Sequence, residues 1–528
     1  MPRHPSPASS LISFALVLAA GCGGGTSGGP SPDGGAGADL SLAQIPHPKL
    51  TPFPAGFLFG TATSAYQVEG QNHATDFFQW EATAANPTMA HSDDGPRSYV
   101  HFEEDNAAAA AMHNNAMRIA IDMARLFPTF DSFPGRPDAA AVKHYHDVFA
   151  SMKAKGLRPM VTLFHWAWPQ WIQDLERITD VSGWQGSGIS QTFAAFAGWA
   201  AREYGAEVDL WCPLNEPMVN LLAGYAQGTH PPLLHYTDPN GLARALLVYR
   251  NMVRAHARAY DALHTNDTVD ADRDGKAALV GIAAPNRIFA AYPSDDPKLL
   301  AQNAEAARQL DYAWNQAYLN AVTSGDLDGD LDNKLDAMVD RKADPDLKGR
   351  LDWIGENYYG ITLVTALGAG SIGPITGLPQ QTALPTDRPK TEFGWDIYPE
   401  GFAQVLDQLK AYKLPIYITE NGLADSTDAQ RPRFLVEHLY AIQKAITEGA
   451  DIRGYFHWSL IDNLEWAAGY CPRFGLYAID FNDPARKRTA RPSADLYRQI
   501  IDARDVDPAL FEKYPTYPAP MKTCKGGG

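Results

Sequence analysis

The sequence predicts an α/β protein built as a single (β/α)8 barrel (TIM barrel) with loop insertions. Between residues 50 and 505, eight short β-rich runs alternate with longer stretches of helical periodicity. Runs such as Met160-Val161-Thr162-Leu163-Phe164 are almost continuously apolar, which is typical of parallel strands buried on both faces. No linker-like stretch divides this region, and eight strand–helix units is the number that closes such a barrel.

Each predicted strand is followed by a stretch that can form the next crossover. The strands are expected at 57–63, 115–121, 158–164, 209–216, 277–283, 351–359, 415–420 and 452–460. Helices are expected between them, for example at 192–204, 303–322 and 434–448. The alternative is an open doubly wound sheet, but the first strand lacks the GxGxxG turn that usually accompanies it.

The ends of the chain differ in composition from the barrel region. Residues 1–21 resemble a bacterial lipoprotein signal peptide, because a ten-residue apolar run at 11–20 is followed by Gly21-Cys22. Residues 22–48, rich in Gly, Ser and Pro, predict a flexible tether. The catalytic domain is then expected at 49–505 and a C-terminal tail at 506–528. We expect an exported protein, anchored by a lipid on Cys22 and facing the periplasm or cell surface, with ordinary secretion as the alternative.

Charge and cysteine content exclude several other classes of protein. A net charge of −17 argues against nucleic acid as a partner, because phosphate groups would be repelled. Besides Cys22 there are three cysteines, an odd number without paired spacing, so no disulfide framework is predicted. CxxC and HExxH patterns are absent from the sequence, which gives no support for a zinc site.

Two glutamates end strands on opposite sides of the predicted ring. Glu216 ends the fourth strand and Glu420 the seventh, so both are expected at the C-terminal mouth of the barrel, where such enzymes place their chemistry. Two carboxyl groups facing each other suit glycoside hydrolysis, provided that their pKa values differ. Arg118 could keep Glu420 ionised, whereas Glu216, without a cation of its own, would keep its proton.

Motifs around these residues extend the interpretation to a family. In chain order they are the segment 57–70 (FLFGTATSAYQVEG), Leu214-Asn215-Glu216-Pro217, Glu356-Asn357-Tyr358-Tyr359, Ile418-Thr419-Glu420-Asn421-Gly422, the segment 458–466 (WSLIDNLEW) and Arg473-Phe474-Gly475-Leu476-Tyr477. With these motifs the chain resembles glycoside hydrolase family 1, the β-glucosidase family, over about residues 50–505.

The resemblance implies a retaining exo-β-glycosidase that needs no cofactor and no catalytic metal. Glu216 would be the acid/base and Glu420 the nucleophile, with their carboxyl groups about 5–5.5 Å apart. Arg118 and Tyr359 would orient Glu420. The implied substrate-binding residues are Gln67, His165, Asn215, Asn357, Trp458, Glu465, Trp466 and Phe474. The intact Glu465-Trp466 pair implies unphosphorylated substrates, namely β-glucosides and cello-oligosaccharides.

Other activities remain open at this stage. A β-galactosidase, β-fucosidase or β-mannosidase differs only in hydroxyl stereochemistry, which sequence does not reveal. A non-catalytic sugar-binding lipoprotein is disfavoured, because a pure binding protein has no need of the carboxylate pair. Oligomeric state is not indicated by any pattern.

A few segments depart from the family or carry separate predictions. Met123 and Met218 replace aromatic residues usual in the family. Met218 would border the leaving-group side of the site, which suggests altered or looser aglycone preference, and we have no account of Glu356. The acidic stretches 270–275 and 326–332 space carboxylates as calcium loops do, although solvated loops are favoured over a structural calcium ion. The segment His144-Tyr145-His146 is expected to face solvent from a helix.

Overall fold

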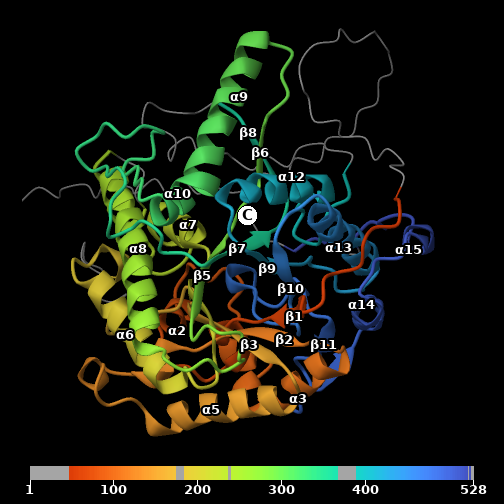
Figure 1. Ribbon diagram of the computed structural model, residues 1–528, viewed down its shortest axis with the longest axis horizontal. Helices are drawn as coiled ribbons and strands as arrows, with labels where there is room; N and C mark the ends of the chain where they lie inside the picture. Colours follow the sequence, from red (N-terminus) through yellow and green to blue (C-terminus); the bar gives the residue numbers. More distant parts are fainter. Residues whose placement is uncertain (1–46, 174–182, 236–238, 367–387, 521, 525–528) are drawn as a thin grey trace, which may run out of the picture.

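Eight parallel strands close into a barrel in the computed structural model of the protein, and helices surround the barrel (Figure 1). The structure describes residues 47–173, 183–235, 239–366, 388–520 and 522–524. The predicted signal peptide and nearly all of the predicted tether lie outside these residues. The strand order around the ring is β1-β10-β9-β7-β5-β4-β3-β2, so that neighbours in sequence are mostly neighbours in space. The predicted fold class is therefore confirmed.

The eight predicted strands are all present, with ends shifted by about two residues at most. They are β1 (Leu58–Ala62), β2 (Ala116–Ala120), β3 (Arg158–Phe164), β4 (Leu210–Leu214), β5 (Leu279–Ala284), β7 (Trp353–Tyr358), β9 (Ile416–Asn421) and β10 (Ile452–Trp458). Two small sheets were not predicted: β6 (Ile288–Ala291) pairs with β8 (Ile361–Val364), and β11 (Tyr477–Ile479) pairs with β12 (Arg488–Ala490). Runs of three or four residues are too short to show a strand period.

Helices cover the outside of the barrel and follow most of its strands. The longer ones are α3 (Ser98–Ala111), α5 (Ala139–Ala154), α6 (Ile189–Tyr204), α8 (Pro239–Asn266), α9 (Pro297–Asp311), α12 (Pro399–Leu409), α13 (Arg431–Thr447) and α14 (Pro492–Ala503). The short ones are α1 (Ala65–Glu69), α2 (Asp76–Glu81), α4 (Met123–Leu126), α7 (Pro217–Asn220), α10 (Ala317–Thr323) and α15 (Ala509–Lys513). The helix expected at 303–322 is interrupted by a π-helical segment, Tyr312–Gln316, and a second π-helical segment spans Leu221–Ala226.

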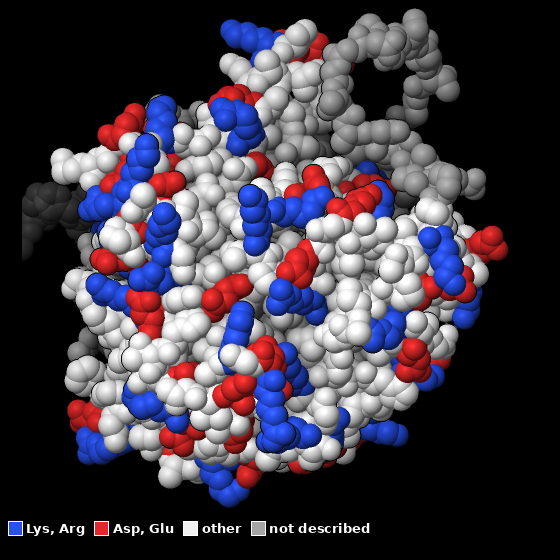
Figure 2. Space-filling model, in the orientation of Figure 1, with Lys and Arg blue, Asp and Glu red and all other residues white. Residues whose placement is uncertain are grey.

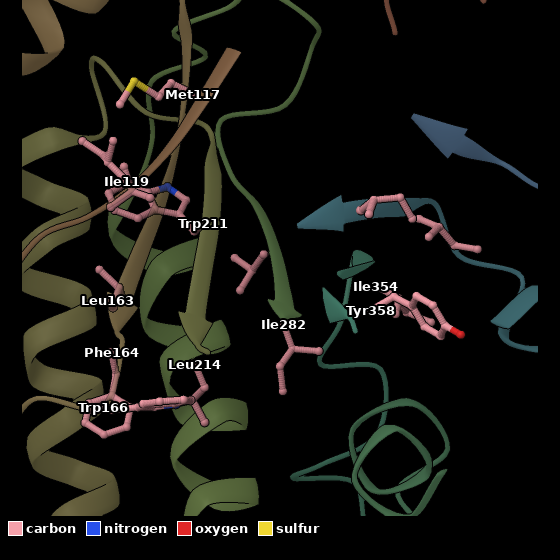
Figure 3. Packing of buried hydrophobic residues seen from close by; sticks show 14 of the residues in the cluster. Met117, Ile119, Leu163, Phe164, Trp166, Trp211, Leu214, Ile282, Ile354 and Tyr358 are labelled. Atoms are coloured by element: carbon pink, nitrogen blue, oxygen red, sulfur yellow. The ribbon is translucent and has the colours of Figure 1, made fainter. Parts of the chain in front are cut away.

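Side chains alternate between the inside and the outside of the barrel along each strand. On β2, Met117 and Ile119 belong to the apolar layer between strands and helices, together with Leu163 and Ile354 (Figure 3). Each fully buried side chain of this kind stabilises the fold by roughly 1.5–3 kcal/mol. The residue between Met117 and Ile119 is Arg118, which the same alternation turns into the barrel.

Glycines make room where the barrel is tightest. A Cβ atom at Gly281 on β5 would lie 2.1 Å from the ring of Trp353, which fills the barrel interior. A Cβ atom at Gly422, just after β9, would lie 1.7 Å from the carbonyl oxygen of Trp458. The close approach at Gly422 brings the ends of β9 and β10 together at the mouth of the barrel.

A disulfide joins Cys471 to Cys524, a pairing that the cysteine count and spacing in the sequence did not indicate. The two cysteines are 53 residues apart in sequence but their Cα atoms are 5.7 Å apart. The C-terminal tail is brought to Cys471 by further contacts, including a bond from Nζ of Lys522 to the carbonyl oxygen of Cys471 at 2.8 Å. The odd count of three cysteines was misleading because Cys212, the third, is a free, buried thiol.

The expectation that His144-Tyr145-His146 faces solvent was also wrong. Tyr145 is 1% exposed, and its hydroxyl accepts a bond from the backbone N–H of Asp122 at 2.9 Å. The ring of His144 stacks on Tyr99, and burial lowers the pKa of His144 to about 4. These three residues span one turn of α5, which packs its inner face against the barrel, so only part of the turn can face water.

The surface carries both signs of charge. On the face shown in Figure 2, basic and acidic side chains are interspersed rather than gathered into one basic stripe. Among the described residues, we find no helix whose length and hydropathy would let it cross a bilayer.

Candidate active site

Glu216 and Glu420 lie at the mouth of the barrel, as the sequence predicted. Glu420 is within β9, and Glu216 follows the end of β4 after Asn215. The backbone N–H of Glu216 donates to the carbonyl oxygen of Ala283 on β5 at 2.8 Å. Glu216 has a φ of 47°, in the left-handed region that residues other than glycine rarely adopt and that often marks functional sites. Both carboxyl groups are buried, with Glu216 7% and Glu420 4% exposed.

Glu420 is bonded through both of its carboxylate oxygens. Nη1 of Arg118 donates to Oε1 at 2.6 Å, and the hydroxyl of Tyr359 donates to Oε2 at 2.9 Å. Arg118 is fully buried, and its Nε also donates to Thr162 Oγ1 at 3.1 Å. Burial raises the pKa of Glu420, but the charge of Arg118 and these bonds oppose that rise. Glu420 is therefore the carboxyl group of the pair that ionises first.

Glu216 has a weaker set of partners. Its Oε1 accepts one bond from Nδ2 of Asn357 at 3.0 Å. Burial, and then the negative charge of Glu420, raise the pKa of Glu216 to about 8. Asn357 also interacts with Glu420, so the two carboxyl groups share a neighbour. The site thus combines a carboxyl group that keeps its proton near neutral pH with one whose ionised form is favoured by Arg118 and Tyr359, as an acid and a nucleophile require.

The sequence interpretation that Glu216 lacks a cation was wrong. The positive charge of Arg287 acts on Glu216 and lowers its pKa, although not enough to cancel the effect of burial. Arg287 lies in the loop between β5 and β6. The sequence showed no motif there, because the loop contributes no part of the family segments.

A chain of amides fixes the orientation of the polar side chains. Oδ1 of Asn215 accepts bonds from Nη2 of Arg118 at 2.7 Å and from Nδ2 of Asn357 at 3.0 Å. Nδ2 of Asn215 therefore points to Nε2 of His165, 3.1 Å away, which must accept. Burial holds the pKa of His165 well below its usual range, so the ring is neutral and carries its proton on Nδ1.

Three predicted sugar-binding residues each keep a buried polar atom without a partner. These atoms are Nδ1 of His165, Oε1 of Gln67 and Oε2 of Glu465. Gln67 is held by its other end, since Nε2 donates to the carbonyl oxygen of Leu464 at 2.8 Å. Buried polar atoms normally have partners, and a set of them at the mouth of a barrel indicates a polar ligand. Nδ1 of His165 can donate, Oε1 of Gln67 can accept, and the carboxyl group of Glu465 can do either according to its protonation, which suits the hydroxyl groups of a sugar.

Glu465 differs from an ordinary surface carboxylate. Burial, followed by the charges of Glu420 and Glu216, raises the pKa of Glu465 to about 8. Glu465 is therefore mainly protonated at neutral pH, and the implied preference for unphosphorylated substrates does not require a negative charge on it. The charges that act on Glu465 are both negative, so a phosphorylated sugar would meet no cation at this residue.

Aromatic side chains form the walls around these polar groups. Trp458, Trp466 and Phe474 are all buried, and the rings of His165 and Trp458 stack with centroids 5.8 Å apart. A flat apolar surface beside polar groups is suited to the face and edge of a sugar ring. The structure thus brings together all twelve residues that the sequence assigned to the site.

Some residues of the site were missed by the sequence analysis. Trp166 donates from Nε1 to the carbonyl oxygen of Asn215 at 3.1 Å, and Thr419 donates to Oδ1 of Asn357 at 2.7 Å. Trp395 stands against Tyr359, with ring centroids 5.7 Å apart. Trp166 and Thr419 are each next to a predicted site residue in sequence, and this proximity could have identified them. Trp395 lies in a segment that contains no predicted site residue.

The residues that departed from the family are all buried. Met123 and Met218 are 3% and 5% exposed and pack in the apolar layer around the barrel. Glu356 is fully buried on β7, where its Oε2 accepts a bond from Nδ2 of Asn286 at 2.8 Å. The effect of Met218 on aglycone preference stays a prediction.

The two acidic stretches fold into clusters of carboxylates. In one, Asp209 joins Asp270 and Asp272; in the other lie Asp328, Asp330 and Asp332. In the first cluster Arg158 forms an ion pair with Asp272, so part of the charge is met by the protein itself. A structural calcium ion stays a prediction, and a rise in melting temperature with millimolar calcium would support it.

Comparison with known proteins agrees with this geometry. Residues 49–506 match glycosyl hydrolase family 1. The chain is 31% identical to a β-galactosidase of Saccharolobus solfataricus over 494 residues, covering 85% of this chain and 94% of that protein. It is 30% identical to β-glucosidase A of Thermotoga maritima over 473 residues, covering 85% and 97%.

A solved structure agrees with the fold and the chemistry. A mutant of a rice β-glucosidase, determined in a covalent complex with Glc, superposes with a TM-score of 0.73 at 28% identity. The match covers 84% of this chain and 98% of the rice protein.

Proposed function

The chain belongs to glycosyl hydrolase family 1, and from this premise we propose that it removes terminal β-D-glucosyl residues from unphosphorylated glucosides and cello-oligosaccharides. As a retaining β-glycosidase it works by double displacement. The observation that carries the proposal is the pair of buried carboxyl groups that share Asn357 as a neighbour and have different partners: Glu420 is bonded to the buried cation Arg118, whereas Glu216 accepts a bond from a neutral amide.

In the first step Glu420 attacks the anomeric carbon of the sugar. The bond from that carbon to the leaving-group oxygen breaks, and Glu216 gives its proton to this oxygen. Arg118 and Tyr359 hold the two oxygens of Glu420 in place, so only a small movement is needed. The products of the step are the free aglycone and a glucosyl ester of Glu420. The covalent Glc complex of the rice relative supports such an intermediate.

In the second step a water molecule replaces the aglycone. Forming the ester removes the negative charge of Glu420, which had raised the pKa of Glu216. Glu216, now ionised, takes a proton from the water as its oxygen attacks the anomeric carbon and Glu420 leaves. Two inversions give overall retention. Both reacting groups are side chains of the chain, so the double displacement involves no cofactor.

The assignment of a sugar to this site rests on buried polar atoms at the mouth of the barrel. His165, Gln67 and Glu465 each offer one polar atom that lacks a partner within the protein. Gln67 follows β1, His165 follows β3 and Glu465 follows β10, so the three residues lie on one half of the barrel mouth. Relatives named β-galactosidase and relatives named β-glucosidase are about equally similar to the chain, so galactosyl, fucosyl and mannosyl substrates are the alternatives to exclude.

A panel of p-nitrophenyl β-glycosides, together with cellobiose and longer cello-oligosaccharides, tests the proposal. We expect the highest kcat/KM for the glucoside, no activity on a 6-phosphoglucoside, and proton NMR showing β-glucose as the first product. A first product of inverted configuration would contradict the mechanism. A higher kcat/KM for the galactoside would correct only the sugar. No hydrolysis of any glycoside would favour a sugar-binding protein.

We further propose that the protein is exported and anchored by a lipid on Cys22. The apolar run at 11–20 before Cys22 supports this, and so does the Cys471–Cys524 disulfide, because disulfides persist in oxidising compartments. Labelling with radioactive palmitate should mark the wild type and not Cys22→Ala. Labelling of both proteins, or of neither, would contradict the lipid anchor.

A further inference from the structure

Arg287 is a cation on the acid/base side of the site that the double displacement does not use. Asn315 fixes its backbone twice: its Oδ1 accepts from the N–H of Arg287 at 3.1 Å, and its Nδ2 donates to the carbonyl oxygen at 2.8 Å. Asn315 is 6% exposed and belongs to the π-helical segment Tyr312–Gln316. Such segments often occur at functional sites, because the extra residue turns a side chain out of the helical register.

The guanidinium of Arg287 is held by neutral groups. Nη1 donates to Thr362 Oγ1 on β8 at 3.2 Å, and the guanidinium carbon lies 5.7 Å from the centre of the Trp314 ring. Nε is buried without a partner. In the described part of the chain no carboxylate lies within ion-pair distance of Arg287. Its positive charge is therefore not neutralised locally, in contrast to Arg118, which is paired with Glu420.

Arg287 and Glu216 are both anchored to segments at the ends of β5 and β7. The backbone N–H of Glu216 is bonded to Ala283 near the end of β5, and the loop that carries Arg287 begins directly after β5. The carboxyl group of Glu216 is bonded to Asn357 on β7, and β8, which anchors the guanidinium, follows β7 after two residues. The backbone of Arg287 and the anchor of its guanidinium thus belong to the segments after β5 and β7, the two strands that also hold Glu216.

Glu356 and Asn286 complete this support. Asn286, next to Arg287, donates to Glu356, and both side chains are buried. Burial holds the pKa of Glu356 well above its usual range, so this carboxyl group is neutral and does not compete for Arg287. This accounts for a glutamate that the sequence left unexplained: it fixes the loop without adding a charge.

We propose that Arg287 is a positioning residue that acts on Glu216 through space, favouring the ionised form and so helping Glu216 to release its proton to the leaving group. The inference rests on the proposed function, in which Glu216 is the acid/base. Glu216 becomes negative as the aglycone departs, and a nearby cation with no partner of its own stabilises that charge.

Other charged and titratable groups also act on Glu216 and contribute to its pKa. They are Glu420 on β9, Arg118 on β2, Glu356 on β7, Tyr359 after β7 and Glu465 after β10. Glu420 opposes ionisation of Glu216, whereas Arg118 favours it but is already paired with Glu420. Arg287 is the cation in this set without an ion-pair partner.

The test compares Arg287→Met with Arg287→Lys, and with Arg308→Met as a control that removes a cation from the exposed face of α9. The alkaline limb of kcat/KM reports the proton on Glu216. Without the cation the pKa of Glu216 rises, so we expect the limb of Arg287→Met to move to higher pH by roughly 0.5–1 unit. Arg287→Lys and Arg308→Met should keep the limb of the wild type.

The leaving group provides a second readout. Arg287→Met should lower kcat/KM at pH 6 by about threefold to tenfold for phenyl glucoside, because Glu216 becomes a weaker acid. It should leave 2,4-dinitrophenyl glucoside almost unchanged, because that aglycone leaves without a proton. Equal losses on both substrates, or an unmoved alkaline limb, would overturn the proposal.

A carbon-13 NMR titration of labelled glutamates, with Glu216→Gln to assign the signal, reads the same effect without any substrate. A higher midpoint for Glu216 in Arg287→Met than in the wild type is the expected result, and an equal or lower midpoint overturns the inference. Because this measurement does not depend on hydrolysis, it separates a failure of the inference from a failure of the proposed function.

Discussion

The two halves of the active site hold the same chemical group in opposite ways. On the nucleophile side, Glu420 is bonded to Arg118 and Tyr359 through both oxygens. On the acid/base side, Glu216 accepts one bond from a neutral amide, and the charge of Arg287 acts on it only through space. Burial is nearly the same for both residues. The difference teaches that direct hydrogen bonds from a cation, not depth in the protein, decide which carboxyl group ionises first.

The strongest way to test this comparison is to remove each carboxyl group in turn, beginning with Glu420→Gly. We expect kcat for aryl glucosides to fall by about 10⁴-fold or more, because no glycosyl ester can form. Added azide should restore hydrolysis of 2,4-dinitrophenyl glucoside and give the α-glucosyl azide, since azide then attacks directly. Undiminished turnover, measured with p-nitrophenyl glucoside, would dispose of the assignment.

Glu216→Ala is the matched change on the other half. For phenyl glucoside we expect a loss of about 10²–10⁴-fold, because general acid catalysis contributes that much. For 2,4-dinitrophenyl glucoside the first step should survive, and azide should give the β-glucosyl azide by attack on the ester of Glu420. The same azide anomer from both variants would show that the two halves do not have separate roles.

Arg118→Met should leave Glu420, like Glu216, without a hydrogen bond from a cation. Loss of the buried cation leaves Glu420 with less support, so the pKa of Glu420 rises and the acidic limb of kcat/KM moves to higher pH. Breaking a buried pair in this way costs about 3–5 kcal/mol of folding free energy, which denaturant titration can measure. Thr162→Val, which removes only a neutral partner of Arg118, is the control. A limb that moves to lower pH would contradict the role of Arg118.

The pH profile of the wild type sharpens the comparison without any substitution. Catalysis requires Glu216 protonated, and burial together with Glu420 raises its pKa to about 8. We therefore expect kcat/KM to be constant between the acidic limb set by Glu420 and this value, and to fall about tenfold per pH unit above it. Stopped assays with p-nitrophenyl glucoside measure the limb. An alkaline limb near the pKa of a free carboxyl group would show that Glu216 is not held neutral.

The smallest effect is expected from Met218, which follows Glu216 and Pro217 on the acid/base half. Methionine offers no rigid stacking face, so Met218→Trp should change the ratio of kcat/KM between aryl glucosides and cellobiose by about threefold to tenfold. The matched control is Met123→Trp in α4. Identical ratios in the wild type and Met218→Trp would show that Met218 has no part in aglycone preference.

The sequence by itself determined the barrel, its eight strands and the residues at their ends. Near-continuous apolar runs such as β3 can be buried only in a parallel sheet covered on both faces, and alternation along β2 directs Arg118 inward. The family motifs placed Glu216, Glu420 and their partners. What it left out were features with no local pattern: the short sheets, the pairing of Cys471 with Cys524, and Trp395.

Only the tertiary structure decided how charge is distributed between the two carboxyl groups. Hydrogen bonds and pKa values depend on which groups lie within a few ångströms of each other and on how much water those groups exclude. Neither the distances nor the exclusion of water can be read from a short stretch of sequence. Arg287 is one example of what the sequence does not show. Its guanidinium acts on Glu216 only after folding brings the loop after β5 against Thr362 on β8. Glu356 is a second example, because the sequence alone does not distinguish a buried, neutral glutamate from a charged one. The sequence pattern determines which residues can be buried. The distances between groups in the folded protein determine how burial changes the pKa of each carboxyl group.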